Sequence, residues 1–62
     1  MERREIIGNM YLSGLTPTAV ARSLKLSAPS VSNVISKKFK SKKIADYIAK
    51  KIGRNRIEIF GY

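Results

Sequence analysis

The side chains best suited to recognition chemistry lie in two adjoining segments, SAPSVSNVIS at residues 27–36 and KKFKSKK at residues 37–43. The hydroxyl and amide groups of the first segment can donate and accept hydrogen bonds at short range. The ammonium groups of the second donate only, and they attract anions. These residue types predict that the chain binds a polar, negatively charged partner.

Catalytic and metal-binding residues are scarce in this chain. It has four acidic residues and neither His nor Cys, so it lacks a thiol nucleophile, an imidazole base, the usual zinc ligands and any disulfide. Helix placement explains Glu2, Glu5 and Asp46, and Glu58 stands alone. We therefore expect a protein that is not an enzyme and that needs no cofactor.

The net charge of the chain limits the kinds of molecule that it is expected to bind. Thirteen Lys and Arg residues against four Asp and Glu give a net charge of +9, and no acid occurs from Thr16 to Ala45. This balance favours a polyanion, although charge alone does not separate DNA, RNA and an anionic membrane. No apolar run approaches the ~20 residues of a membrane span, and the first residues lack the order of a signal peptide, so a cytoplasmic location is expected.

Sixty-two residues predict one small all-α domain covering residues 1–62. A first helix is expected over residues 2–13, ended by Gly14, and a second over about 17–24, with Thr16 as its N-cap. A third is expected from 28 to about 37, and a fourth from about 42, with Ser41 as its N-cap and Gly53 at its end. A turn or short fifth helix at Ile59 and Phe60 is expected to close the core. The fourth helix carries Asp46 and Lys50 at a spacing that would let them pair.

Apolar spacing in the middle of the chain predicts a helix-turn-helix over residues 17–36. The inward residues are expected to be Val20, Ala21 and Leu24 in the first helix of the pair, Val31, Val34 and Ile35 in the second, and Leu26 in the turn, where it could fill the shared core. Ala21 matters most, because a large side chain there would push the two helices apart.

The opposite face of the third helix is small and polar, as a helix that enters the major groove of DNA requires. The base-reading candidates on helix 28–37 are Ala28, Pro29, Ser32, Asn33 and Ser36. Asn33 leads them because its amide can form two hydrogen bonds with adenine. An ordinary solvated surface is the alternative interpretation, and it fits Ser36 equally well.

The residues expected to bind phosphate lie before, within and after helix 28–37 in the sequence. They are Thr16, Thr18, Ser27, Ser30, Lys37, Lys38, Lys40, Lys42 and Lys43. Ser27 should also cap the third helix through the Ser30 N–H.

Lys42 and Lys43 are unfavourable in the first turn of a helix unless a bound phosphate offsets their charge. The alternative is that this helix begins later. Phe39 could either anchor the loop or lie against DNA, and Arg54 and Arg56 are expected to be surface charges or tail contacts.

The segments LTPTAVARSL, SAPSVSNVIS, KKFKSKKI, IAKKIG and EIF resemble the small phage helix-turn-helix regulators of the lambda repressor-like fold, in particular the Ner-like DNA-binding regulators. The resemblance covers nearly the whole chain. It implies a compact four- to five-helix domain and a transcription factor of phage or prophage origin. It also implies that residues 27–30, 32 and 33 face the major groove. The chain departs from the family at Lys25, where glycine is usual, and at Phe60 and Gly61, where tryptophan and proline are common.

The expected function is therefore that of a sequence-specific double-stranded DNA-binding regulator, most simply a repressor that occludes a promoter. The alternative is an antitoxin or accessory interaction module that binds nucleic acid without sequence preference. An RNA-binding module is less well supported, because no interleaved aromatic platform is present. A homodimer stays open, with Tyr11, Tyr47, Phe60 and Tyr62 as interface candidates if the core does not include them.

Overall fold

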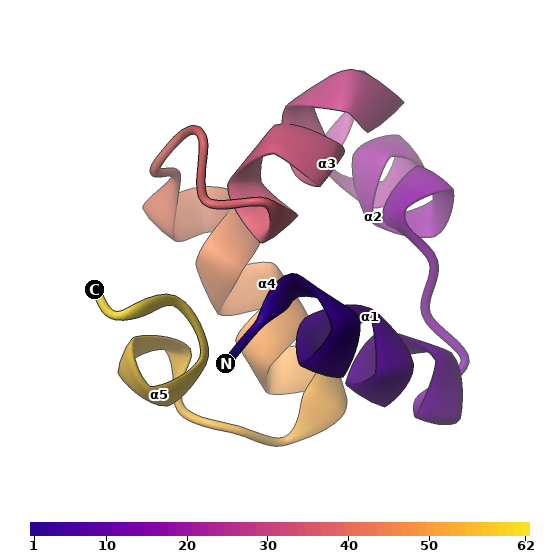
Figure 1. Ribbon diagram of the computed structural model, residues 1–62. Coiled ribbons are helices and arrows are strands. Elements are labelled where there is room, and N and C mark those ends of the chain that lie inside the picture. Colours follow the sequence, from indigo (N-terminus) through magenta and orange to yellow (C-terminus); the bar gives the residue numbers. More distant parts are fainter.

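Apolar residues spaced one helical turn apart, together with local caps, divide the chain into five α-helices in the computed structural model, which describes residues 1–62 (Figure 1). They are α1 (Arg3–Leu12), α2 (Pro17–Leu24), α3 (Ala28–Ile35), α4 (Lys42–Ile52) and α5 (Arg56–Phe60). No strand is present. The prediction of an all-α domain is confirmed, and the expected fifth element is a short helix.

Local capping chemistry sets most of the helix ends. The Thr16 side chain accepts a hydrogen bond from the Ala19 N–H at 3.1 Å, and the Ser41 side chain accepts one from the Ile44 N–H at 3.4 Å. Gly53 ends α4 with a left-handed φ of 71°. These caps confirm the predicted starts of α2 and α4, and they place Lys42 and Lys43 in the first turn of α4.

The hydrophobic core gathers around α4, which contacts each of the other four helices and runs through the middle of the molecule in Figure 1. The fully buried large side chains are Ile6, Met10, Ile35, Ile48, Ile59, Val20, Val31 and Val34. Ala21 is 4% exposed where α2 packs on α3, as its small size predicts. This single core holds α3 against the rest of the domain.

Two predictions about packing are wrong. Leu26 is 40% exposed and lies outside the core, because the chain leaves α2 through the left-handed residue Lys25 and this reversal leaves Leu26 at the rim. Asp46 does not pair with Lys50. Its Oδ1 accepts a hydrogen bond from Arg56 Nη1 at 2.9 Å, since the packing of α5 on α4 brings the guanidinium closer.

The segment after α4 closes the fold. Ile59 is fully buried and Phe60 is 5% exposed, so the core includes both, as expected. Arg54 forms an ion pair with Glu58 at 2.8 Å, so Glu58 is not isolated. The domain measures 25 × 23 × 18 Å. Its longest helix, α4, has 11 residues, and none of the five has the length and apolar character needed to cross a bilayer.

Candidate nucleic-acid interface

The outer face of α3 carries the predicted base-reading side chains. Val31, Val34 and Ile35 are at most 2% exposed and fix the orientation of the helix. Pro29 is exposed on the opposite side, and Ala28, Ser30, Ser32 and Asn33 are partly exposed. Because these side chains are short, nothing on this face would hold the helix backbone away from a flat or grooved partner.

Hydrogen-bonding groups on this face are largely free. The one side-chain hydrogen bond there joins Ser27 Oγ and Ser30 Oγ at 2.8 Å. The Ser32 hydroxyl and the Asn33 amide have no partner within the protein, and no side-chain polar atom is buried without one. Both groups can therefore form hydrogen bonds with a bound molecule without breaking an internal bond.

The predicted Ser27 cap is wrong in detail. Ser27 is the N-cap residue of α3, but its side chain caps no backbone N–H. The Ser30 N–H instead donates to the backbone carbonyl of Ser27 at 3.1 Å. Since that N–H is already bonded and Pro29 has no N–H to offer, the Ser27 hydroxyl pairs with the Ser30 hydroxyl.

Helix α3 ends two residues earlier than predicted. Ser36 is its C-cap, and Lys37 has a left-handed φ of 63°. The Lys37 N–H donates to the Val34 carbonyl at 3.0 Å, and the Lys38 N–H donates to the Asn33 carbonyl at 2.9 Å. This pair of bonds is the Schellman motif that commonly ends helices. Ser36 therefore lies at the end of α3, and Lys37 lies just beyond it and not within a continuing helix.

The segment after α3, defined here as the basic loop of residues 37–41, presents exposed cations. Lys37, Lys38 and Lys40 are exposed, and none of them forms an ion pair. Phe39 is 62% exposed, so it does not anchor the loop in the core. The next two residues, Lys42 and Lys43, are also exposed, which extends the cationic surface to the start of α4.

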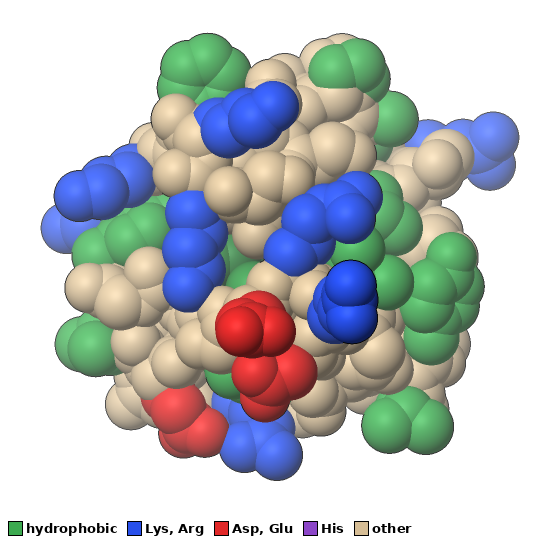
Figure 2. All heavy atoms as spheres, viewed as in Figure 1, with side chains coloured by type: hydrophobic (Ala, Val, Ile, Leu, Met, Phe, Trp, Pro, Cys, Tyr) green, Lys and Arg blue, Asp and Glu red, His purple; other side chains and the backbone are tan.

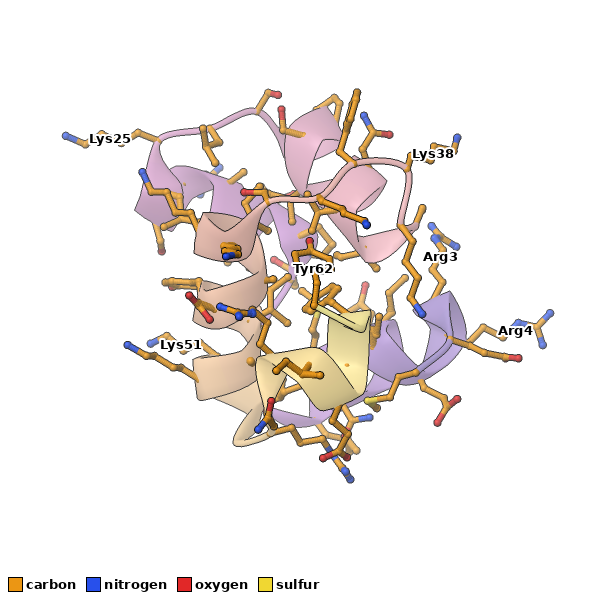
Figure 3. All side chains as sticks on the ribbon, turned by 90° about the vertical axis from the view of Figure 1, so that its left-hand side faces the viewer. Arg3, Arg4, Lys25, Lys38, Lys51 and Tyr62 are labelled. Atoms are coloured by element: carbon orange, nitrogen blue, oxygen red, sulfur yellow. The ribbon has the colours of Figure 1, made fainter.

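Tyr62 holds the basic loop in place. Its hydroxyl accepts a hydrogen bond from the Ser41 N–H at 2.9 Å, and the Lys40 ammonium lies 5.9 Å from the centre of its ring. The Tyr62 carbonyl in turn accepts a hydrogen bond from Arg56 Nε at 2.7 Å. Figure 3 shows Tyr62 between α5 and this loop. Sequence reasoning missed this role because the partners are 21 residues apart and share no local pattern.

The two threonines proposed as phosphate ligands differ in their surroundings. Thr18 is exposed in the first turn of α2 and is free to bind an anion. Thr16 is partly buried, and its hydroxyl oxygen already accepts the Ala19 N–H, so only its O–H remains to donate outward.

Charge is distributed unevenly over the molecule. Residues 16–45 carry seven Lys and Arg and no acid, so seven of the nine net positive charges lie in the part built from α2, α3, the basic loop and the start of α4. Both ion pairs lie elsewhere: Arg56 of α5 pairs with Asp46 of α4, and Arg54, in the link between these helices, pairs with Glu58 of α5. In Figure 2 most of the visible Lys and Arg side chains lie above the acidic ones. The cations of residues 16–45 are therefore unneutralised.

No pocket is found on the surface, and the candidate site is an open face. Comparisons with protein-family models, curated proteins and solved structures give no match to this chain. The resemblance to the Ner-like regulators therefore stays a prediction. The case for a function rests on the α3 face and its cations.

Proposed function

We propose that this protein is a sequence-specific double-stranded DNA-binding regulator that places α3 in the major groove. One observation carries the proposal: the accessible face of α3 consists of short side chains, among which Ser32 and Asn33 have free hydrogen-bonding groups, and exposed lysines without an ion pair follow it in the chain. Small polar groups suit base edges, and lysines suit the phosphates on either side of them.

In this proposal Asn33 reads adenine through its amide, and Ser32 donates to or accepts from a neighbouring base. Ala28 and Pro29 lie in the first turn of α3, where they allow close approach and apolar contact with a thymine methyl group. Ser36, at the C-cap, contacts the edge of the site.

Phosphate contacts would come from both sides of α3. Ser27, Ser30, Thr16 and Thr18 lie at the starts of α2 and α3. The lysines that follow α3 are Lys37, Lys38, Lys40, Lys42 and Lys43. A phosphate at the start of α4 would gain from the helix dipole and from two ammonium groups, which explains why cations occupy that first turn.

The finer assignment is a lambda repressor-like domain whose α2 and α3 form a helix-turn-helix. The three-residue turn from Lys25 to Ser27 and the small Ala21 at the junction support it. By its resemblance to the Ner-like regulators, the protein would be a phage or prophage repressor that occludes a promoter. It would act at the nucleoid in the cytoplasm, as a monomer or as a homodimer on a palindromic or repeated operator.

The experiment that tests this function is fluorescence anisotropy with duplexes tiled across the region upstream of the protein's own gene, with a scrambled duplex as control. A duplex bound at least ~10³-fold more tightly than the scrambled one is the expected result. Equal binding to every duplex, followed by the absence of any preferred sequence in a selection from random duplexes, would refute sequence-specific regulation.

A second candidate is the antitoxin or accessory module. The observation that favours it is the pair of exposed apolar side chains at the end of α1, where Tyr11 is 64% exposed and Leu12 is 88% exposed. A protein partner would cover such a pair. Binding of a partner protein that survives Ser32→Ala and Asn33→Ala, together with DNA binding that shows no sequence preference, would favour this candidate.

A further inference from the structure

Two lysines of this chain have a left-handed backbone conformation, whereas glycine occupies the other left-handed positions. Lys25 has a φ of 57° and Lys37 a φ of 63°, and the remaining residues with positive φ are Gly14, Gly53 and Gly61. A side chain with a Cβ is disfavoured in this region, and asparagine, aspartate and histidine tolerate it better than lysine does. The presence of lysine at both sites therefore calls for a reason in the side chain.

The backbone at these sites gains nothing from lysine. The Lys25 N–H donates to the Arg22 carbonyl at 3.3 Å, and the Leu26 N–H donates to the Ala21 carbonyl at 2.8 Å. The Lys37 site makes the same pair of bonds at the end of α3. Glycine at either position would make identical bonds, because only backbone atoms take part.

The side chains of both lysines are exposed and have no partner within the protein. Neither forms an ion pair, a side-chain hydrogen bond or a contact with an aromatic ring, whereas Lys40 and Lys51 lie over tyrosine rings. Both lysines lie at the C-terminal end of a helix, where the helix dipole favours an exposed cation by about 0.3–1 kcal/mol. That gain is smaller than the roughly 1–2 kcal/mol that a left-handed conformation costs a residue with a Cβ. A partner outside the domain would account for keeping a charge at both positions.

The two lysines lie near the two ends of α3. Lys25 lies two residues before Ser27, the N-cap of α3, and Lys37 directly follows Ser36, its C-cap. At 1.5 Å per residue the eight residues of α3 span about 12 Å, which is about the width of the major groove. Figure 3 shows Lys25 and Lys38, the neighbour of Lys37, projecting from opposite sides of the same end of the molecule.

We propose that Lys25 is a phosphate-binding residue and that it acts with Lys37 as a pair of clamps at the two ends of α3, each kept in an unfavourable backbone conformation because its charge is needed there. This inference rests on the proposed DNA-binding function. It adds a ligand, Lys25, at the end of α3 opposite the basic loop. It also predicts that glycine at either position lowers DNA affinity without lowering the stability of the fold.

The test compares Lys25→Gly and Lys37→Gly with the unaltered protein by thermal denaturation and by DNA binding over a salt series. Each variant should be at least as stable as the unaltered protein, because glycine relieves the left-handed strain. Each should bind every duplex about fivefold more weakly at 0.15 M salt, with the slope of log K against log salt reduced by about 0.9, as the loss of one phosphate contact requires.

Two controls accompany these variants. Lys25→Arg keeps the charge and the strain, so it should retain affinity. Lys51→Ala removes a charge at the far end of α4 and should leave the affinity unchanged (Figure 3).

Three results would overturn the inference alone: unchanged affinity in Lys25→Gly, a shift in its sequence preference, or a loss of fold stability in that variant. Failure of the unaltered protein to bind any duplex would overturn the proposed function and this inference together.

Discussion

At the scale of single residues, the free amide of Asn33 and the unpaired lysines at the start of α4 would make different contributions to the proposed DNA complex. The amide would distinguish one base from another, because its donor and acceptor match a particular base edge. A lysine contacts phosphates that are the same in every sequence. Substitutions at the two kinds of residue should therefore produce different signatures.

Replacing Ser32 and Asn33 with alanine should remove sequence preference. A good two-bond contact with a base contributes about 1–3 kcal/mol of discrimination, so the preferred duplex should lose about that much free energy of binding while the scrambled duplex loses little. Competition binding with both duplexes measures the difference. Ser13→Ala, at the exposed C-cap of α1, is the matched control and should leave the preference intact. An unaltered preference in the double variant would exclude these residues as base readers.

Replacing Lys42 and Lys43 with alanine should weaken all duplexes by a similar factor and reduce the salt slope by roughly two units. Stability of the fold should rise, because each cation in the first turn of a helix is unfavourable by about 0.3–1 kcal/mol. Urea denaturation and a salt series of binding curves give the two quantities. Lys50→Ala with Lys51→Ala, in the last turn of the same helix, is the control that should keep the slope. A changed sequence preference would contradict the phosphate role.

At the scale of elements, the position of the basic loop depends on a contact from the far end of the chain. Tyr62 binds the Ser41 N–H through its hydroxyl and lies near the Lys40 ammonium. The loop connects α3 to α4, so this contact helps to fix its lysines relative to the outer face of α3.

Tyr62→Phe should loosen the loop without unfolding the domain. It removes the hydroxyl that accepts the Ser41 N–H, which should lower the free energy of unfolding by about 0.5–1.5 kcal/mol. Amide hydrogen exchange at Ser41 should become faster. Tyr11→Phe is the matched control, because that residue is 64% exposed and its hydroxyl has no partner. Unchanged exchange at Ser41 would show that the hydroxyl does not restrain the loop.

The sequence predicts those elements whose signals are local. The sequence predicts that Thr16 and Ser41 cap α2 and α4, and both side chains do so, because a cap depends only on residues within one turn. The apolar spacing of α3 and α4 likewise identified the side chains that face the core. The inward face of α3 then determines its outer face, so the positions of Ser32 and Asn33 could also be predicted.

Other features depend on contacts between residues that are far apart in the sequence, or on backbone conformations that no local pattern reveals. The predicted third helix was two residues too long because lysine, and not glycine, occupies the left-handed position that ends it at residue 37. Asp46 pairs with Arg56 and Ser41 with Tyr62, and both contacts require the packing of α5, which no spacing pattern reveals. Leu26 is apolar, but the turn that exposes it is set by the backbone of Lys25.

At the scale of the whole molecule, the domain depends on one small core. At about 0.05–0.15 kcal/mol per residue, a domain of 62 residues has roughly 3–9 kcal/mol of stability. The last helix contributes Ile59 and Phe60 to that core. Loss of the contacts of α5 would therefore affect α3, although α5 carries none of the proposed DNA ligands.

Ile59→Ala should unfold a large part of the population. Removing this fully buried side chain costs about 2–5 kcal/mol, which is close to the total stability. Circular dichroism during urea denaturation measures the change. Ile57→Ala lies in the same helix, but that side chain is 60% exposed, so the expected change is within about 0.5 kcal/mol. Equal effects of the two substitutions would show that α5 is not part of the cooperative core.

The uneven distribution of charge affects the encounter that precedes any contact. With seven of its nine net positive charges in residues 16–45, the protein has an electric dipole whose positive end is the end that carries α3. The field of a nucleic acid exerts a torque on such a dipole and rotates the protein during its approach, within about one Debye length of ~8 Å at physiological salt. More collisions then begin in a productive orientation, so added salt should slow association by randomising that orientation, in addition to weakening the complex once it has formed.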